Sequence, residues 1–400
     1  MTPASGAQAW IPNRLKAALV ALALMAILPL GNAIAQESKL AATPPMGWSA
    51  WYGFGCNVTE ADVKKSVDTM VSNGMKAAGY EYVNLDDCWQ GTRDSEGLIH
   101  SNNRFPDMKA LGDYIHSRGF KFGIYSSPGP RTCGGFTGSY GYEKQDAGTY
   151  ASWGVDFLKY DWCSAADVYK PDQIEAAYEK MHEAILATGH PIVYSLCEYG
   201  VDAPWIWGPK VGANLWRTTG DVSNLVGFQE FQRMMFVGFS QDGLQSYAGP
   251  GHWNDPDFLQ IGVRGLDLDA ERTQMSLWSL LAAPLISSTD LTRLTQAQLA
   301  ILTNREVIAV DQDPMSIQGR RISQIGPVQV WVKKLSRGRI AVGFINSGES
   351  PLPASVNFRK IGYPHPVKVR DLWEKKDLGI FNGSYSTTIP KHGVVLIEIH

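Results

Sequence analysis

The sequence lacks several short patterns that identify common kinds of binding site. No Gly-x-Gly-x-x-Gly follows the first predicted strand, so the dinucleotide-binding fingerprint is missing. The five cysteines show no Cys-x-x-Cys spacing and the 8 histidines no His-Glu-x-x-His, which disfavours a protein-bound metal. Lys and Arg number 36 against 39 Asp and Glu, so no basic excess of the kind that attracts nucleic acid or anionic lipid is present. We therefore expect no metal, no organic cofactor and no nucleic-acid partner.

Long apolar runs are also scarce, because the sequence contains a single one, close to its start. It extends over Ala17 to Leu30, which is shorter than the roughly 18 residues expected of a membrane-spanning helix. Arg14 and Lys16 precede it, and small residues ending at Ala35 follow it. This order predicts a secretory signal peptide over residues 1–35 and a secreted or periplasmic protein with no membrane association after cleavage.

Cysteine is rare, and its number limits the disulfides. An exported chain can form disulfides, but an odd number of cysteines leaves at least one thiol unpaired. The spacing alone does not choose the pairs among Cys56, Cys88, Cys133, Cys163 and Cys197.

What the sequence does contain is an alternation of strand-like and helix-like segments. With 400 residues, 44% of them apolar and 19% charged, the chain has enough material for two globular domains. Eight strands that alternate with helices predict an α/β fold, and eight parallel strands close the (β/α)8 TIM barrel. We place this catalytic barrel at residues 36–315. The predicted strands are 46–51, 82–87, 121–126, 155–161, 192–198, 214–221, 252–257 and 285–290, and the clearest helices are 59–78, 107–118, 171–187 and 268–282.

The pattern changes over residues 316–400. Short, often alternating apolar runs separated by turn-forming residues are typical of an antiparallel β-sandwich. We expect strands at 328–332, 339–346, 354–358, 367–373, 384–390 and 394–400.

Polar and charged residues collect where the predicted barrel strands end. All carboxyl ends of barrel strands converge on one face, which is where such enzymes build their sites. The sequence therefore predicts an acid-rich pocket made by residues 86–87, 159–161, 197–198, 217–221 and 255–257.

Two aspartates in this set could carry out glycoside hydrolysis. Lys159 and Asp161 share a strand face, and a neighbouring ammonium keeps a carboxylate ionised and available as a nucleophile. Asp221 supplies the second carboxyl group that such chemistry needs as a proton donor. The alternative interpretations are a buried ion pair for Asp161 and a helix cap for Asp221.

The neighbouring residues favour a sugar as the ligand. Paired carboxylates such as Asp86 and Asp87 accept hydrogen bonds from vicinal hydroxyls, although a calcium site or a loop cap is the alternative. Aromatic residues near the strand ends either pack in the core or form walls for the apolar face of a sugar. These residues are Trp48, Trp51, Tyr125, Trp162, Tyr199, Trp216 and Trp253.

Seven motifs carry these residues along the chain. They are Pro45-Met46-Gly47-Trp48, Leu85-Asp86-Asp87-Cys88, Gly123-Ile124-Tyr125-Ser126, Lys159-Tyr160-Asp161, Leu196-Cys197-Glu198, Trp216-Arg217 and Trp253-Asn254-Asp255-Pro256-Asp257. Together they resemble the α-galactosidases, or melibiases, of glycoside hydrolase family 27, from about residue 42 to the end. The resemblance implies a retaining exo-glycosidase that removes terminal α-D-galactose from oligosaccharides, galactomannans or glycoconjugates.

The resemblance also implies roles for individual residues. Asp161 matches the family's nucleophile and Asp221 its acid/base. Cys56 would pair with Cys88, and Cys133 with Cys163. The expected substrate-binding residues are Trp51, Asp86, Asp87, Tyr125, Lys159, Cys197 (the unpaired thiol), Glu198, Arg217 and Asp257.

Glu198 bears on which sugar is bound. Relatives that act on N-acetylgalactosamine resemble this motif but have small residues here, so a glutamate is expected to fill the space of the 2-acetamido group. The acidic pair Asp86 and Asp87 likewise differs from relatives that prefer β-L-arabinopyranosides. An α-N-acetylgalactosaminidase, a β-L-arabinopyranosidase and a non-catalytic carbohydrate-binding barrel are the alternatives to an α-galactosidase.

Overall fold

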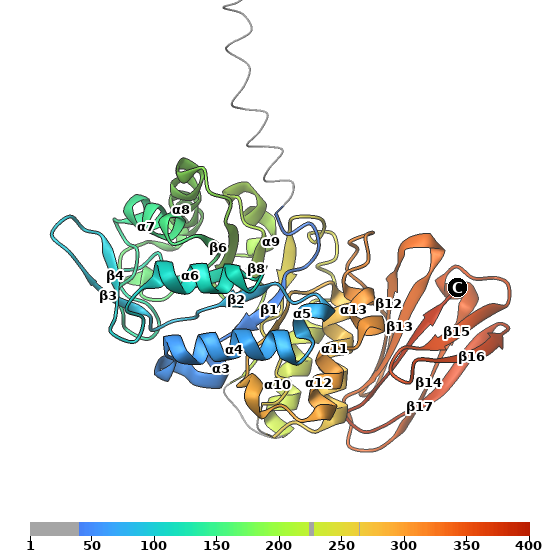
Figure 1. Cartoon of the computed structure of the whole chain (residues 1–400). Helices are drawn as coiled ribbons and strands as arrows, with labels where there is room; N and C mark the ends of the chain where they lie inside the picture. The colour runs from blue at the N-terminus through green and yellow to red at the C-terminus, as the bar shows by residue number, and fades with distance from the viewer. Residues whose placement is uncertain (1–39, 224–227, 264) are drawn as a thin grey trace, which may run out of the picture.

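The computed structural model describes residues 40–223, 228–263 and 265–400, which form a barrel and a sandwich packed side by side (Figure 1). The signal peptide predicted for residues 1–35 lies outside these residues. Within the described ranges, no helix combines the length and the apolar character needed to cross a membrane.

Eight parallel strands form the barrel, in the order β10-β1-β2-β5-β6-β7-β8-β9. A parallel bridge between Leu259, just after β9, and Ser287 of β10 joins the two edges of the sheet. Each strand overlaps one of the eight predicted from sequence, so the predicted fold class is confirmed. The strands are Met46–Ser49 (β1), Tyr82–Asn84 (β2), Lys121–Ser126 (β5), Val155–Asp161 (β6), Val193–Cys197 (β7), Leu215–Arg217 (β8), Trp253–Asp255 (β9) and Leu285–Ser287 (β10).

Helices connect the strands and cover the outside of the barrel (Figure 1). Two of them begin where the sequence predicts. Thr59 caps α4 in a reciprocal capping box with Asp62, and Asp107 caps α6 by accepting from the Ala110 N–H at 2.8 Å. The helices are Trp51–Phe54 (α3), Glu60–Ser72 (α4), Met75–Ala78 (α5), Met108–Ser117 (α6), Glu143–Ser152 (α7), Ile174–Thr188 (α8), Pro204–Trp207 (α9), Phe228–Phe239 (α10), Leu268–Leu281 (α11), Gln296–Leu302 (α12) and Arg305–Asp311 (α13).

The barrel interior is closed by apolar side chains. One buried cluster draws its members from six strands of the sheet, so it fills the space that the strands enclose. It consists of Tyr82, Phe157, Val193, Leu215, Trp253, Phe258, Ala282 and Ile286. The barrel interior is therefore a packed core.

The C-terminal region is an antiparallel sandwich, as predicted. A six-stranded sheet in the order β11-β12-β13-β18-β15-β16 packs against the pair β14-β17 around a second buried apolar cluster. Strands β11 and β16 were not predicted from the sequence; they are the edge strands and contain no fully buried residue. The strands are Arg320–Ile325 (β11), Val328–Lys334 (β12), Ile340–Asn346 (β13), Leu352–Asn357 (β14), Val367–Asp371 (β15), Lys376–Phe381 (β16), Ser384–Ile389 (β17) and Val394–Ile399 (β18).

A short hairpin in the barrel was also missed. Gln90–Arg93 (β3) and Ile99–Ser101 (β4) pair antiparallel between β2 and α6. The hairpin projects from the barrel at the end far from the sandwich (Figure 1).

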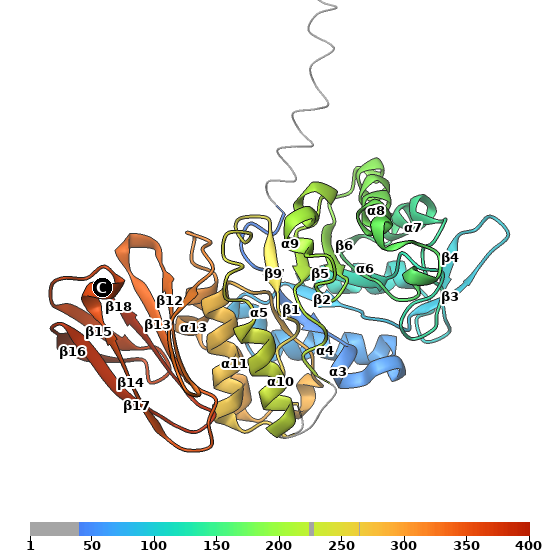
Figure 2. The same cartoon turned by 180° about the vertical axis from the view of Figure 1, so that it is seen from behind.

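Helices α10, α11 and α13 lie between the barrel and the sandwich (Figure 2). Trp331 of β12 stacks on Phe239 of α10 with ring centroids 6.3 Å apart, and it is completely buried. Gly343 of β13 lets the sheet approach α11, since a Cβ there would lie 2.4 Å from the Leu280 side chain. The buried ammonium of Lys333 donates to the backbone carbonyl of Ser279 at 2.9 Å. The two domains therefore share one packed and hydrogen-bonded interface.

Replacing Trp331 with alanine should destabilise the whole protein, because the buried indole fills space between the two domains. Large-to-small changes of buried aromatic residues cost about 3–5 kcal/mol. Urea unfolding followed by far-UV circular dichroism measures this change, with Ile325→Ala, at a position 78% exposed, as the matched control. A loss below 1 kcal/mol in Trp331→Ala would contradict a close-packed interface.

Candidate active site

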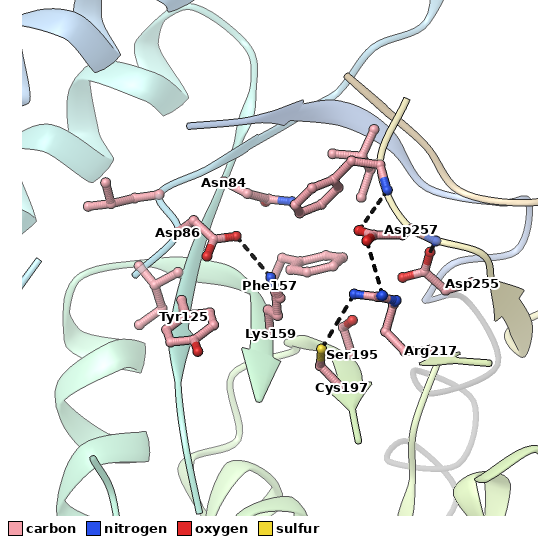
Figure 3. A pocket seen from close by; sticks show the side chains of 14 residues that line it. Asn84, Asp86, Tyr125, Phe157, Lys159, Ser195, Cys197, Arg217, Asp255 and Asp257 are labelled. Carbon is pink, nitrogen blue, oxygen red and sulfur yellow. Dashed lines mark hydrogen bonds and ion pairs between the residues drawn. The ribbon is translucent and has the colours of Figure 1, made fainter. Parts of the chain in front are cut away.

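One cavity opens at the carboxyl ends of the barrel strands. Its floor and its mouth share the side chains of Asp86, Tyr125, Lys159, Arg217, Asp257 and Phe258. Figure 3 shows the floor. Lys159 lies beside Asp86 and near the ring of Tyr125, and Arg217 lies beside Asp257. Strand β6 reaches from the floor to the mouth. Phe157 and Lys159 line the floor, and Lys159 and Asp161 line the mouth.

Lys159 is a cation of the floor whose side chain is 16% exposed. Its ammonium donates to Asp86 Oδ2 at 3.2 Å and lies 5.2 Å and 5.0 Å from the ring centroids of Tyr125 and Phe258. Burial alone would lower the pKa of Lys159, but the charges of Asp86, Asp161 and other neighbours raise it well above its ordinary value. Lys159 therefore remains an ammonium throughout the physiological range.

Asp161 lies at the mouth end of β6 and is 5% exposed. Its Oδ1 accepts a hydrogen bond from the Tyr199 hydroxyl at 2.6 Å, while Oδ2 accepts none from the described residues. Burial raises the pKa of Asp161 above its ordinary value, and Lys159, the Tyr199 hydrogen bond and Arg217 oppose this rise. Asp161 thus presents one oxygen that is held by a neighbour and one that is available.

Asp221 lies at the rim of the same cavity, in the segment after β8. Its carboxylate is 44% exposed and accepts from Arg217 Nη2 at 3.2 Å. Its backbone carbonyl accepts from Arg233 Nε at 2.8 Å. The strand predicted over residues 214–221 ends at Arg217, so Asp221 lies in a loop and not on the sheet.

Arg217 connects several carboxylates under the rim. Its Nη2 contacts Asp221 and also lies 3.0 Å from Asp257 Oδ2. Its Nη1 lies 3.7 Å from the buried thiol of Cys197. Asp255 is also buried beside it, and burial raises the pKa of Asp255 to about 6, against the charge of Arg217. One guanidinium thus compensates several acidic groups, of which Asp255 and Asp257 are buried and Asp221 is exposed.

Asp86 and Asp87 follow β2 and are both buried. Asp86 Oδ2 also accepts from the Ser49 hydroxyl at 3.2 Å. Asp87 Oδ2 accepts from the Gly134 N–H at 2.6 Å, and burial raises the pKa of Asp87 against this and other hydrogen bonds. Both side chains line the mouth, where their oxygens can accept from hydroxyl groups of a ligand.

The structure places Glu198 differently from the expectation that it fills space beside the sugar. Ser195 and Cys197 line the cavity floor, so the alternation of β7 turns Glu198 away from it. Its carboxyl group is fully buried, and burial raises its pKa well above the ordinary value, against backbone hydrogen bonds from Glu198 and Gly200. Glu198 is not among the residues that line the floor or the mouth.

The aromatic residues near the strand ends divide between wall and core. Trp51, Tyr125 and Tyr199 line the mouth of the cavity. Trp162 stacks on Tyr178, with ring centroids 5.6 Å apart, and is a packing residue. The fully buried side chains of Trp48, Trp216 and Trp253 belong to the core.

Both expected disulfides are present. Cys56 is bonded to Cys88 and Cys133 to Cys163, and Cys197 is a free, buried thiol. Among the described residues, the sole group with metal-ligand spacing is Cys133, Asp161 and Cys163. Its two sulfurs are already joined to each other, so a single carboxylate remains and no ligand set for a metal exists there.

Three residues of the site were not predicted as substrate-binding residues from the sequence. Tyr52 and Phe258 line the mouth, and nothing in their sequence context marks them. Tyr199 was grouped only with the aromatic residues, although its hydroxyl contacts Asp161. A tyrosine directly after the Cys197-Glu198 motif is the signal that could have singled it out.

The fold and the cavity define a barrel enzyme of the glycoside hydrolase class. The sequence profile described as "Alpha galactosidase A" matches residues 43–313, and that of the "Alpha galactosidase C-terminal beta sandwich domain" matches residues 325–399. The chain therefore belongs to the α-galactosidase family, glycoside hydrolase family 27.

Individual relatives cover nearly the whole chain. The α-galactosidase A of Cellvibrio japonicus is 40% identical over 96% of this chain and 99% of its own. The crystal structure of α-galactosidase I from Mortierella vinacea superposes with a TM-score of 0.84 at 34% identity, covering 90% of this chain and 98% of the other. An α-galactosidase from Saccharomyces cerevisiae, solved with raffinose, has a TM-score of 0.85 at 27% identity and covers 91% of this chain and 99% of its own.

Replacing Asp255 with asparagine should stabilise the protein at neutral pH. The carboxyl binds its proton more tightly in the folded state, where its pKa is about 6, than in the unfolded chain, where it is near 3.8. The stability of the wild type therefore falls as pH rises from about 4 to 6, and an uncharged amide escapes this loss. We expect a gain of roughly 1–3 kcal/mol at pH 7.5 that disappears below pH 4.

Urea unfolding across this pH range measures the difference. Asp113→Asn is the control, because that carboxylate is 60% exposed. An Asp255→Asn variant that is less stable than the wild type at pH 7.5 would show that Asp255 is held as a carboxylate by Arg217.

Proposed function

We propose that the protein is a retaining exo-α-galactosidase in which Asp161 is the nucleophile and Asp221 the acid/base. Family membership and the α-galactosidase relatives support the release of galactose from galactosides. The observation that carries the assignment of roles is that both carboxyl groups line one cavity, with Asp161 nearly buried and Asp221 exposed at the rim. A nucleophile must reach the anomeric carbon at the bottom, whereas an acid/base must meet the leaving group and water.

In the first step, Asp161 Oδ2 attacks the anomeric carbon as the bond to the leaving oxygen breaks. The electron pair of that bond stays on the leaving oxygen, which takes a proton from the Asp221 carboxyl group. Lys159 and Arg217 keep their charges beside Asp161, and a nearby cation favours the ionised carboxylate that this attack requires.

In the second step, a water molecule attacks the same carbon from the rim. Asp221, now a carboxylate, takes a proton from this water, and the bond between Asp161 and the sugar breaks. Two displacements at one carbon give a product with the configuration of the substrate. Arg217 donates to Asp221 at 3.2 Å and holds it at the rim during both steps.

The remaining side chains of the mouth fit recognition of a galactosyl ring. Asp86 and Asp87 offer oxygens to the 4- and 6-hydroxyls, and Lys159 offers a donor to a neighbouring hydroxyl. Arg217 and Asp257 lie where the 2-hydroxyl would approach, and Trp51 and Tyr125 form the wall. The buried Cys197 thiol lines the floor under this ring, and Glu198, the next residue, is buried outside the cavity lining. Oligosaccharides, galactomannans and glycoconjugates all present such a terminal ring.

The chain order fits an exported enzyme. We propose that residues 1–35 are a signal peptide, residues 36–315 the catalytic barrel and residues 316–400 the sandwich. The two disulfides support an oxidising destination, outside the cell or in the periplasm. The sandwich covers the flank of the barrel formed by α10, α11 and α13 (Figure 2).

Asp161→Asn should reduce turnover of a nitrophenyl α-galactoside by at least about 10⁴-fold while leaving the protein folded, because an amide does not attack the anomeric carbon. A 2-deoxy-2-fluoro galactosyl fluoride should label the wild type on the peptide that contains Asp161. NMR of the first product should show the α-anomer. Label on another residue, or a β-configured first product, would refute the assignment.

The same assay run with α-N-acetylgalactosaminide and β-L-arabinopyranoside tests the sugar preference. We expect the α-galactoside to be turned over at least tenfold faster than either. No turnover of all three sugars would instead support a binding protein that has lost its activity.

Asp221→Ala should discriminate between leaving groups. Protonation matters most when the leaving oxygen is basic, so activity on an alkyl or sugar α-galactoside should fall by at least about 10³-fold. With a dinitrophenyl α-galactoside, the first step should remain fast. Added azide should speed up the second step by attacking in place of water. Equal losses on both substrates, without azide rescue, would exclude Asp221 as the acid/base.

A further inference from the structure

Tyr199 makes a contact with Asp161 that the two-carboxylate mechanism does not use. Its hydroxyl lies 2.6 Å from Asp161 Oδ1 and within 3.4 Å and 3.6 Å of the sulfurs of Cys133 and Cys163. A phenol has one proton to donate, and the carboxylate is the strongest acceptor of the three. The hydrogen bond therefore goes to Asp161, and the disulfide sulfurs enclose the hydroxyl.

The backbone is bent to bring Tyr199 to this place. Its φ is +62°, and Gly200, Asp202 and Ala203 also have left-handed φ values, of +80°, +60° and +52°. Such a conformation is rare for a large side chain and persists only where its surroundings impose it. Because β7 ends at Cys197, this loop and not the strand determines how Tyr199 approaches Asp161.

Close packing holds this loop on the next strand of the barrel. A Cβ at Gly200 would lie 2.2 Å from the Thr218 backbone oxygen, so only glycine permits the approach. Thr218 directly follows Arg217, and its N–H donates to the Asp255 carbonyl at 3.1 Å. The position of Tyr199 is thus determined by the same strand ends that hold the rest of the site.

We propose that Tyr199 is a positioning residue that holds Asp161 by Oδ1, leaves Oδ2 free for attack, and assists the departure of Asp161 in the second step. This inference rests on the proposed function, because it assigns the attack to Asp161. In the first step Oδ2 forms the bond to carbon, and Oδ1 becomes the carbonyl oxygen of the ester. In the second step the electron pair of that bond returns to Asp161, and the Tyr199 proton stabilises the carboxylate that reappears.

The two steps respond to this hydrogen bond in opposite directions. A donor to a carboxylate stabilises its negative charge, so it makes Asp161 a less reactive nucleophile and a better leaving group. Loss of the donor should therefore slow the second step more than the first. A residue that only shapes the cavity would change substrate binding and would not separate the steps in this way.

The pH dependence provides a second readout, because the Tyr199 hydrogen bond favours the ionised form of Asp161. The pKa of the Tyr199 hydroxyl is itself raised far above its ordinary value by burial and by Asp161, so it stays a donor. The other groups that face Asp161 remain in the variant and set the baseline. Among the described residues they are Asp86, Asp87, Tyr125, Lys159, Tyr178, Cys197, Glu198, Arg217 and Asp221.

Tyr199→Phe tests the inference on the full-length enzyme, since it removes the hydroxyl and keeps the ring. Tyr160→Phe is the matched control, because Tyr160 lies next to Asp161 and its buried hydroxyl has no hydrogen-bond partner among the described residues. With a dinitrophenyl α-galactoside, kcat of Tyr199→Phe should fall by about 10- to 100-fold, in line with a lost hydrogen bond to a charged group. KM should fall together with kcat, and the ratio kcat/KM should change less than about threefold near neutral pH.

Two further measurements should agree with this result. The 2-fluoro galactosyl enzyme should recover activity about tenfold or more slowly in Tyr199→Phe than in the wild type. The acidic limb of kcat/KM should move upward by roughly 0.5–1 pH unit, because Asp161 then holds its proton to higher pH. Tyr160→Phe should match the wild type in all three measurements.

The outcomes separate this inference from the proposed function. If the label of the wild type lies on Asp161 but Tyr199→Phe keeps the wild-type kcat, recovery rate and acidic limb, Tyr199 does not act on Asp161. A rise in KM at constant kcat would make Tyr199 a binding residue and would also overturn the inference. If the wild type carries its label elsewhere, the proposed function itself fails, whatever Tyr199→Phe does.

Discussion

The site depends on the charge compensation that two cations, the buried Arg217 and the largely buried Lys159, give to a group of carboxylates. Lys159 and Arg217 are the basic residues that line the cavity, and six aspartates line it with them. Burying several carboxylates without cations would protonate them or unfold the region, because the charged form loses its hydration. The cations reach the site from β6 and β8, so the sheet itself determines where negative charge can be held.

The sandwich belongs to this arrangement through the helices that it covers. Trp331 packs on α10, and Arg233 of that helix donates to the backbone of Asp221 at 2.8 Å. A rim residue in a loop is thus connected to a helix that is fixed from its other side by the second domain. Covering a flank of the barrel and fixing the rim of the cavity are consequences of the same packing.

The sequence was sufficient for the parts of the molecule that follow a regular period. All eight barrel strands were predicted, because buried parallel strands bounded by polar residues are continuous apolar runs. The edge strands β11 and β16 were missed, since one-sided, largely exposed strands carry little apolar signal. The residues of the cavity were mostly predicted because they follow strand ends, whose place in a barrel is known in advance.

The directions of the Glu198 and Tyr199 side chains depend on the backbone at the end of β7. The alternation of a strand predicts directions only while the backbone stays extended, and β7 ends at Cys197. Glu198 keeps the outward direction of the alternation, and Tyr199, like Cys197, faces the cavity, although it lies in a loop and its φ is left-handed. A resemblance between motifs gives residue types and spacing but no dihedral angles, so it could not distinguish these two neighbours.

The unequal surroundings of Asp161 and Asp221 explain how one type of side chain can serve two purposes. Asp161 is 5% exposed, hydrogen-bonded to Tyr199 and close to Lys159, so its charge is stabilised by fixed groups and not by water. Asp221 is 44% exposed in a loop, where both a leaving group and an incoming water can reach it. Fixed stabilisation suits a group that must return to the same charged state after each turnover. Access to solvent suits a group that gives up a proton in one step and regains it in the next.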